Sequence, residues 1–364
     1  MRTELLCIGN AVVDVFINID NSLADKYGIR EFAQHIDLKT VNAILQEPSI
    51  NFSKAVKSSG GGAANVAKIA AMLGMNTVFS GCTGNDELAG IFENNLTDAG
   101  VRIMLIKSIE KTGICFACNI TGTSNESSKA KFPGTNKISE TRFAACPGAA
   151  LELTESHISE ELISGAEVVV LDGYILGRRP LVQHILLNAS RRGIPVALDV
   201  ASTFQAKSKA EEILTYSRSF PIILFMNADE TLTFYNTVRK SRDEDVNLSE
   251  KEKEAIILRD VSPMLKIITD GELFPIIVVK LGSRGAIVYA GGNVYREETF
   301  SIIPRNTVGA GDAFCAAFIS AWVRGKSLSE CAALGNKVAR KILEVPGTRI
   351  RSDKLKKFAK TLQI

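Results

Sequence analysis

The hydrophobic positions of the chain fall into short continuous runs separated by helical patterns. Apolar runs over 168–171, 195–199, 222–225 and 275–280 lack the alternation of a half-exposed strand, and a helical segment is predicted after each. Buried strands that alternate with helices are typical of a parallel sheet covered on both faces. The pattern therefore predicts an α/β fold with a mostly parallel central sheet.

The N-terminal part of the chain continues this rhythm. Its pattern predicts strands over 5–9, 12–19 and 77–80, and helices over 63–73 and 86–99. Asn85 is expected to cap the second of these helices, and Gly100 is expected to end it.

Two segments, 18–52 and 112–146, interrupt the alternation. The second contains the β-rich runs GICFACNI and KAKFP, separated by Gly, Ser and Asn. Long insertions inside compact domains are usually functional lids or disordered loops. We expect residues 1–364 to form one domain whose two insertions build a small β-sheet lid.

Composition and charge exclude several classes of protein. The chain is 46% hydrophobic and 23% charged, which is ordinary for a globular protein, and its net charge of +3 comes without a concentrated basic stripe for nucleic acid. We find neither a signal peptide nor the ~20 consecutive apolar residues of a membrane span. We therefore expect no nucleic acid and no membrane as partners.

The seven cysteines indicate a reducing compartment. Most lie in apolar runs, such as Cys7 in LLCIG and Cys315 in AFCAAF, and buried free thiols favour the cytoplasm. Cys115 and Cys118 form a CxxC, which alone suggests redox or metal chemistry. The run CFACNI is typical of a strand, however, and a strand places these two side chains on opposite faces.

The first chemical motif reads TVGAGD and leads into the helical run AFCAAFISAWVRG. Gly309 and Gly311 allow a tight turn that leaves N–H groups unpaired at the mouth of a helix, where anions bind. Phosphoryl transfer needs such a cradle, and it needs a carboxylate to accept the proton of the attacking hydroxyl. Asp312 supplies that carboxylate. The alternative is a capped helix whose glycines only turn the chain.

Two further motifs offer polar groups to a polyol. Gly61 and Gly62 stand at the mouth of a helix that carries Asn65, whose side chain can both donate and accept hydrogen bonds. The alternative is a flexible glycine turn, since Asn65 stands where a dinucleotide fingerprint has its third glycine. Asp14 is a lone acid in an apolar strand, so it either faces a site or turns to solvent at the strand end.

Asn227 and Glu230, in NADE, follow an apolar strand directly. Ligands of α/β sheets bind beyond the carboxyl ends of the strands, so Glu230 is a candidate to organise Mg²⁺ through water and phosphate. The start of a capped helix is the alternative.

Together these motifs resemble the ribokinase-like family of sugar and nucleoside kinases, also called the PfkB carbohydrate kinase family. GGGAANVAKIAAMLG is similar to its N-terminal pattern, NTVGAGDAFCAAF to its C-terminal pattern, and NADE and KLGSRGA to the motifs between them. The resemblance implies a three-layer α/β/α domain with a β-sheet lid. It also implies an ATP- and Mg²⁺-dependent kinase that phosphorylates a hydroxymethyl group of a nucleoside or sugar.

The resemblance also assigns roles to residues. It implies Asp312 as the base, with an anion hole formed by Gly309, Ala310 and Gly311. It implies that the substrate hydroxyls are bound by Asp14, Gly61, Gly62 and Asn65. It places on the nucleotide side Asn227, Glu230, Gly282, Gly285 and Asn336. No residue is expected to ligate a metal directly, although Glu230 can act through water.

Two departures from the family pattern and the choice of substrate stay open. Asn306 stands where the family usually has Asp, which predicts little dependence on a monovalent cation such as K⁺. The lid segment 122–141 is longer and more polar than is common. GNAVVDV, LDGYILGRRP and ALDVASTF resemble adenosine-kinase-type members and favour adenosine. The alternatives are a free sugar such as ribose or fructose, a sugar phosphate that meets Lys129, Lys131 and Arg142, or binding without catalysis. A monomer and a homodimer both fit.

Overall fold

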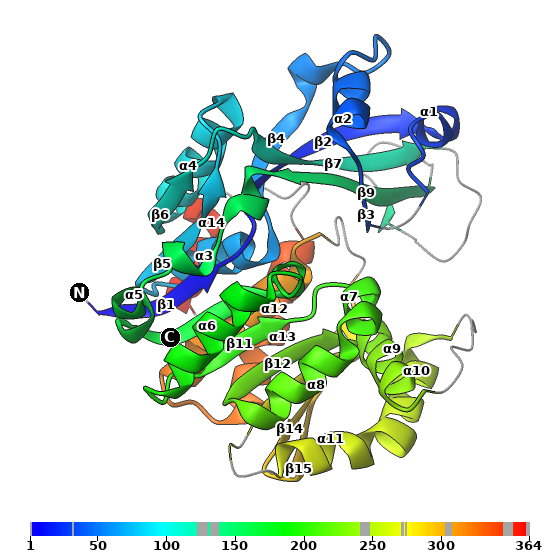
Figure 1. The fold of residues 1–364 in the computed structure, drawn as a ribbon. Coiled ribbons are helices and arrows are strands. Elements are labelled where there is room, and N and C mark those ends of the chain that lie inside the picture. Colours follow the sequence, from blue (N-terminus) through cyan, green and yellow to red (C-terminus); the bar gives the residue numbers. More distant parts are fainter. Residues whose placement is uncertain are drawn as a thin grey trace.

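A nine-stranded sheet forms the centre of the protein (Figure 1). The computed structural model describes residues 2–30, 33–121, 130–131, 138–240, 248–270, 273, 275–302, 308–344 and 352–361. The strands follow the order β15-β14-β13-β12-β11-β10-β1-β5-β6, and every pair from β6 to β13 is parallel. The strands are β1 (Thr3–Ile8), β5 (Thr77–Thr83), β6 (Arg102–Lys107), β10 (Ala166–Asp172), β11 (Val196–Asp199), β12 (Ile222–Asn227), β13 (Ile276–Lys280), β14 (Ala286–Ala290) and β15 (Asn293–Glu297).

One edge of this sheet departs from the predicted alternation. A helix was predicted after the run at 275–280, but β14 and β15 follow and pair antiparallel. The prediction was wrong because the short turn Gly282–Arg284 leads into Gly285, whose φ of +90° sends the chain back along the sheet. A Cβ on Gly285 would lie 2.1 Å from the carbonyl oxygen of Glu297, so this turn requires glycine.

Helices cover both faces of the central sheet, which confirms the three-layer α/β/α prediction. Val170 and Phe225 lie on one face, under α3 (Gly62–Met72), α4 (Glu87–Ala99), α12 (Ala310–Val323), α13 (Leu328–Leu343) and α14 (Ser352–Thr361). Val169 and Leu224 lie on the other face, under α5 (Glu160–Ser164), α6 (Arg179–Ser190), α7 (Thr203–Ser208), α8 (Ala210–Ser219), α9 (Ala228–Val238) and α11 (Ser262–Thr269). Beside α9 lies α10 (Glu250–Ile256).

A smaller sheet stands above the central one in Figure 1, in the order β3-β9-β7-β2-β4 with β8 paired to β9. Its strands are β2 (Val12–Asp20), β3 (Ala33–His35), β4 (Val56–Gly60), β7 (Thr112–Thr121), β8 (Ala130–Lys131) and β9 (Ile138–Gly148). The expected lid segments 18–52 and 112–146 therefore leave out β4 and most of β2. Segment 18–52 instead supplies β3 and two helices, α1 (Asn21–Lys26) and α2 (Leu38–Leu45).

The N-terminus of α4 differs from the prediction by one residue. Asp86, not Asn85, is the cap: its carboxylate accepts from the N–H of Ala89 at 3.0 Å. It also accepts from the N–H and the hydroxyl of Thr112, at 2.8 and 2.7 Å, and this tertiary contact decides which residue caps the helix. Gly100 ends the helix with a φ of +98°, as predicted.

Replacing the cap of α4 tests this assignment. Asp86→Ala removes three hydrogen bonds and should lower the free energy of unfolding by about 1–2 kcal/mol. Asn85 is exposed, so Asn85→Ala should change it by less than about 0.5 kcal/mol. Urea unfolding measures both variants, and equal effects would contradict the assignment.

Candidate active site

Polar residues end four neighbouring strands of the central sheet. Asp172, Asp199, Asn227 and Lys280 are the last residues of β10, β11, β12 and β13. Because these strands are parallel and adjacent, the four side chains gather at one edge, where α/β sheets bind ligands. The sheet therefore provides a polar floor for a site.

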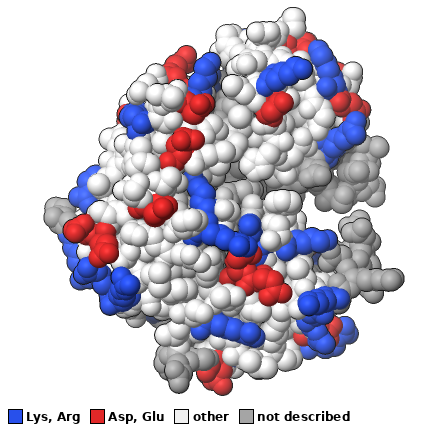
Figure 2. All heavy atoms as spheres, in the orientation of Figure 1, with Lys and Arg blue, Asp and Glu red and all other residues white. Residues whose placement is uncertain are grey.

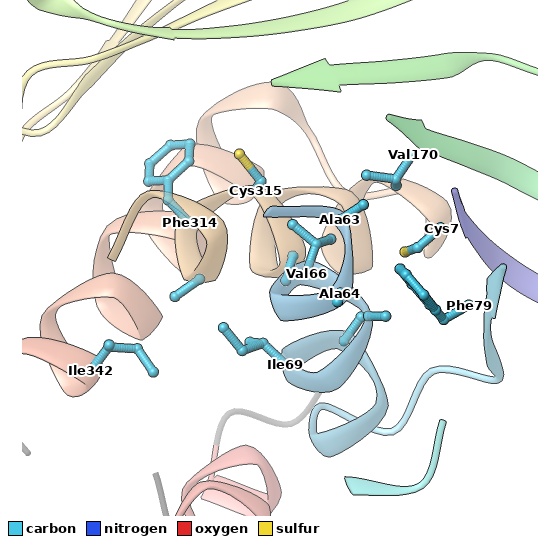
Figure 3. Packing of buried hydrophobic residues seen from close by; sticks show 14 of the residues in the cluster. Cys7, Ala63, Ala64, Val66, Ile69, Phe79, Val170, Phe314, Cys315 and Ile342 are labelled. Atoms are coloured by element: carbon cyan, nitrogen blue, oxygen red, sulfur yellow. The ribbon is translucent and has the colours of Figure 1, made fainter. Parts of the chain in front are cut away.

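Two helix N-termini meet above this floor. Ala63 and Val66 of α3 lie beside Cys315 of α12, as Figure 3 shows. This close packing brings Asn65 within reach of Asp312: the Asn65 amide donates to a carboxylate oxygen of Asp312 at 2.8 Å. The structure thus joins two motifs that lie 247 residues apart in the chain.

The N-terminus of α12 borders a cavity through Val308 and Gly309. Gly309 is the N-cap with a left-handed φ of +81°, and it provides no side-chain cap for the N–H groups of the first turn. Burial, and to a smaller extent the Asp199 carboxylate, raises the pKa of Asp312 to about 7, and the hydrogen bond from Asn65 opposes the shift. A carboxylate with a pKa near 7, beside unpaired N–H groups, suits proton abstraction next to a bound anion.

Asp14 lies in the small sheet and faces the same region. Its carboxylate fills the space above Gly60, where a Cβ would lie 2.3 Å from Oδ1. Burial raises the pKa of Asp14 to about 6, against the lowering effect of the Lys68 ammonium. A cavity of about 310 Å³ is lined by Asp14 together with Asn65, Lys68 and Gly309. The structure therefore brings together candidates from three separate motifs.

The glycines before Asn65 have a packing role. Gly61 has a φ of +93°, and a Cβ there would lie 2.3 Å from the carbonyl oxygen of Asn10. A Cβ on Gly62 would lie 3.2 Å from Cβ of Asp172, whose carboxylate accepts from the N–H of Ala63 at 3.2 Å. These glycines let α3 begin directly against β10.

Asn227 and Glu230 form a capping box at the start of α9. The Asn227 side chain accepts from the Glu230 N–H at 2.9 Å, and the Glu230 carboxylate accepts from the Asn227 N–H at 2.8 Å. Glu230 is nevertheless buried, and burial raises its pKa to about 7 while the Lys280 ammonium lowers it. Glu230 therefore both caps α9 and places a buried ionisable group at the end of β12.

The remaining nucleotide-side candidates lie at the β13–β15 edge. Asn336 donates to the carbonyl oxygen of Glu297 at 3.3 Å, the same oxygen that a Cβ on Gly285 would approach. Gly282 lies against Glu250, which would be 2.7 Å from a Cβ. Asn336 and Gly285 therefore both lie next to the carbonyl oxygen of Glu297.

Several predicted positions need separate mention. Asn306 and Lys129, and the side chain of Lys131, lie outside the described residues. Arg142 donates to the carbonyl oxygen of Ile29 at 2.8 Å. The two cysteines of the CxxC lie in β7 as predicted, and both are buried free thiols.

Four charged groups of this region were not predicted as site residues: Lys68, Asp172, Asp199 and Lys280. Burial lowers the pKa of Lys68 to about 8, against the Asp14 and Asp312 carboxylates, and its ammonium donates to the carbonyl oxygen of Ser59 at 2.7 Å. Lys68 was visible as the one charge in VAKIAAMLG. Asp172, Asp199 and Lys280 were visible as polar ends of apolar runs.

A helix N-terminus beside a cavity and a buried carboxylate, both above a parallel sheet, are an arrangement typical of α/β enzymes that bind an anionic group. Comparison with known proteins makes this class specific. Residues 26–355 match the pfkB family carbohydrate kinases, and the chain belongs to this family. It is a phosphotransferase with an alcohol group as acceptor, and ATP binding follows from the family.

Individual relatives are distant but cover most of the chain. An adenosine kinase of Schizophyllum commune is 24% identical over 374 residues, which cover 97% of this chain and 98% of that protein. A 5-dehydro-2-deoxygluconokinase of Bacillus subtilis (strain 168) is 24% identical over 313 residues, which cover 83% of this chain and 85% of that protein. The crystal structure of adenosine kinase from Sinorhizobium meliloti is 23% identical, with a TM-score of 0.78 over 99% of both chains. The ribokinase-like fold is thus confirmed.

Proposed function

We propose that this protein is an ATP-dependent nucleoside kinase that transfers the γ-phosphate to the 5′-hydroxyl of adenosine. The observation that carries the proposal is the Asn65–Asp312 hydrogen bond at the open mouth of α12. Adenosine kinases are also among the relatives and solved structures that match nearly the whole chain.

Each candidate residue has a role in this proposal. Asp312 accepts the proton of the attacking hydroxyl, and the N–H groups of Gly309, Ala310 and Gly311 hold the transferred phosphate. Asp14, Gly61, Gly62 and Asn65 bind the ribose hydroxyls, and the two glycines also let α3 begin directly against β10. The nucleotide is bound on the side of Asn227, Glu230, Gly282, Gly285 and Asn336.

Magnesium belongs to the proposal only as part of the nucleotide. Among the described residues, no three His, Cys, Asp or Glu side chains converge to hold a metal ion. Asp199 is paired with Lys280, and Glu230 caps α9, so these carboxylates are already engaged. We therefore propose that Mg²⁺ binds the ATP phosphates and would neutralise part of their charge. Glu230 would contact this ion through a water molecule.

A sugar kinase is the second candidate. The 5-dehydro-2-deoxygluconokinases among the relatives are 23–25% identical, about as similar as the adenosine kinases. An acceptor panel with Mg-ATP separates the candidates, by comparing kcat/KM for adenosine, other nucleosides, ribose, fructose and 2-deoxygluconate derivatives. The highest value for a sugar would overturn adenosine, and binding of an acceptor without ATP consumption would favour a non-catalytic protein.

The proposed base makes the reaction dependent on pH. Asp312 acts only when it is ionised. Its pKa of about 7, against about 4 for an ordinary aspartate, should shift the acidic limb of the pH–activity profile from about pH 4 to about pH 7. We expect kcat/KM to fall about tenfold per pH unit below pH 7, and more steeply below pH 6 as Asp14 is protonated. Initial rates from pH 5 to 9 measure this, with circular dichroism as the control for folding. A limb near pH 4 would contradict the assignment.

Other predictions from the sequence are carried forward as part of the proposal. Lys, Arg, Asp and Glu side chains are mixed over the face drawn in Figure 2, in keeping with a net charge of +3. In the described part of the chain, no helix combines the length and apolar character needed to cross a bilayer. Cytoplasmic location, monomer or homodimer, and weak dependence on K⁺ stay predictions.

A further inference from the structure

A buried ion pair lies beneath the start of α12. The Lys280 ammonium, at the end of β13, donates to both oxygens of Asp199, at 2.8 and 3.1 Å. The Cys315 thiol, one turn beyond Asp312, donates to the same carboxylate at 3.0 Å. Both partners of the pair are nearly buried, with side chains 13% and 11% exposed. Two strand ends and one helix therefore fix the position of a single positive charge.

This charge lies directly against the anion-binding turn. A Cβ built on Gly311 would be 3.4 Å from Nζ of Lys280. Gly311 is in the first turn of α12, where N–H groups are unpaired. An anion held by that turn would thus lie next to the Lys280 ammonium.

Asp312 lies among charges of both signs. Among the described residues, its own helix contributes the Cys315 thiol, α3 contributes Asn65 and Lys68, and three strands contribute Asp172, Asp199 and Lys280. Glu230 of α9 faces the Lys280–Asp199 pair. A phosphate arriving here meets several carboxylates, so a fixed cation beside the turn is needed to hold it.

Lys280 stays protonated, and only two of its three N–H donors are used by Asp199. Burial alone would lower the pKa of Lys280, but the neighbouring carboxylates outweigh burial and raise it. An ammonium has three donors. Within the described part of the chain, two of them meet Asp199 and the third meets the Cys315 sulfur at 3.9 Å, which is a weak acceptor. That third donor is available to an oxygen of a bound phosphate.

We propose that Lys280 binds the terminal phosphate of the nucleoside triphosphate, with Asp199 and Cys315 as positioning residues that hold the ammonium beside Gly311. The inference rests on the proposed function and adds a phosphate-contacting cation to its site. It predicts a specific discrimination: Lys280 recognises the triphosphate and contributes little to a diphosphate.

Calorimetric titration tests this without turnover. Lys280→Met should weaken binding of the β,γ-imido analogue of ATP by about 10- to 100-fold and binding of ADP by less than about threefold. Lys280→Arg keeps the charge and should retain most of the affinity. Lys266→Met, which removes an exposed lysine of α11, is the matched control and should bind both nucleotides like the wild type. Equal losses for the analogue and ADP, or no loss, would overturn the proposal.

A second variant guards against misfolding, because removing one partner of a buried ion pair leaves the other unpaired. Lys280→Met combined with Asp199→Asn leaves no unpaired charge and should show the same selective loss for the triphosphate. A double variant that binds the analogue like the wild type would overturn the proposal.

The pH profile distinguishes an electrostatic role from a structural one. Lys280 lowers and Asp199 raises the pKa of Asp312. Lys280→Met should therefore move the acidic limb of kcat/KM to higher pH, and Asp199→Asn should move it to lower pH. Shifts in the same direction would count against the proposal. A wild-type chain that binds the analogue but phosphorylates no acceptor would overturn the proposed kinase, while the binding comparison would still test Lys280.

Discussion

Asp312→Asn should lower kcat by about 10²- to 10⁴-fold while leaving the Kd of the acceptor nearly unchanged. Asparagine keeps an acceptor oxygen for the Asn65 amide, which donates to Asp312 at 2.8 Å, so the geometry of the site is retained. It cannot take the proton of the attacking hydroxyl. Steady-state rates with Mg-ATP and calorimetric binding of the acceptor measure the two quantities separately.

The same variant should not lose stability. The pKa of Asp312 in the folded protein, about 7, lies above the unfolded value near 4 because of burial. The ionised carboxylate therefore destabilises the fold, and this loss grows as pH rises from about 4 to 7. At pH 8 the melting temperature of Asp312→Asn should equal or exceed that of the wild type. Asp25→Asn, on the exposed side of α1, is the control, and a near wild-type kcat for Asp312→Asn would remove Asp312 from the mechanism.

Gly60→Ala should raise KM for the acceptor by about 10- to 100-fold and lower the free energy of unfolding by about 1–3 kcal/mol. A methyl group at this position would lie 2.3 to 2.5 Å from three atoms of the Asp14 carboxyl group. Gly60 is not among the glycines with positive φ, so the backbone tolerates alanine and the collision alone causes the effect. Displacing Asp14 would remove the hydrogen bonds that we propose it makes to the acceptor hydroxyls.

Gly90→Ala is the matched control. Gly90 lies in α4, and nothing lies within 4 Å of a Cβ built there. The change should stabilise the protein by about 0.5–1 kcal/mol through helix propensity and leave KM unaltered. If Gly60→Ala kept a wild-type KM for the acceptor, Asp14 would have no part in binding it.

The sequence predicted those features whose cause is local. Continuous apolar runs predicted β10, β11, β12 and β13, because a strand buried on both faces needs no polar alternation. Glycines before a helical run predicted the mouths of α3 and α12. Asp312 and Asn65 could therefore be predicted from the residues next to them in the sequence. Neither motif, however, predicts the hydrogen bond between them.

The features that were missed depend on strand order. Asp199 and Lys280 are 81 residues apart and meet only because β11 and β13 flank β12. Each looked like one polar residue after an apolar run, with no spacing to link it to the other. The limits of the small sheet were misjudged for the same reason: β2 and β4 belong to it through pairing with each other, which a one-dimensional pattern does not record.

The position of α12 and α13 after all nine strands of the central sheet has a consequence for biosynthesis. When Glu297 has been made, all nine strands of the central sheet exist, but Phe225 still lacks Phe318, its ring partner at 5.4 Å. At about 10 residues per second, the apolar face of the nascent sheet waits several seconds for its cover, a period in which aggregation competes. The segment that begins to cover this face also carries Asp312. The chain therefore acquires the proposed catalytic base together with the helix that covers Phe225.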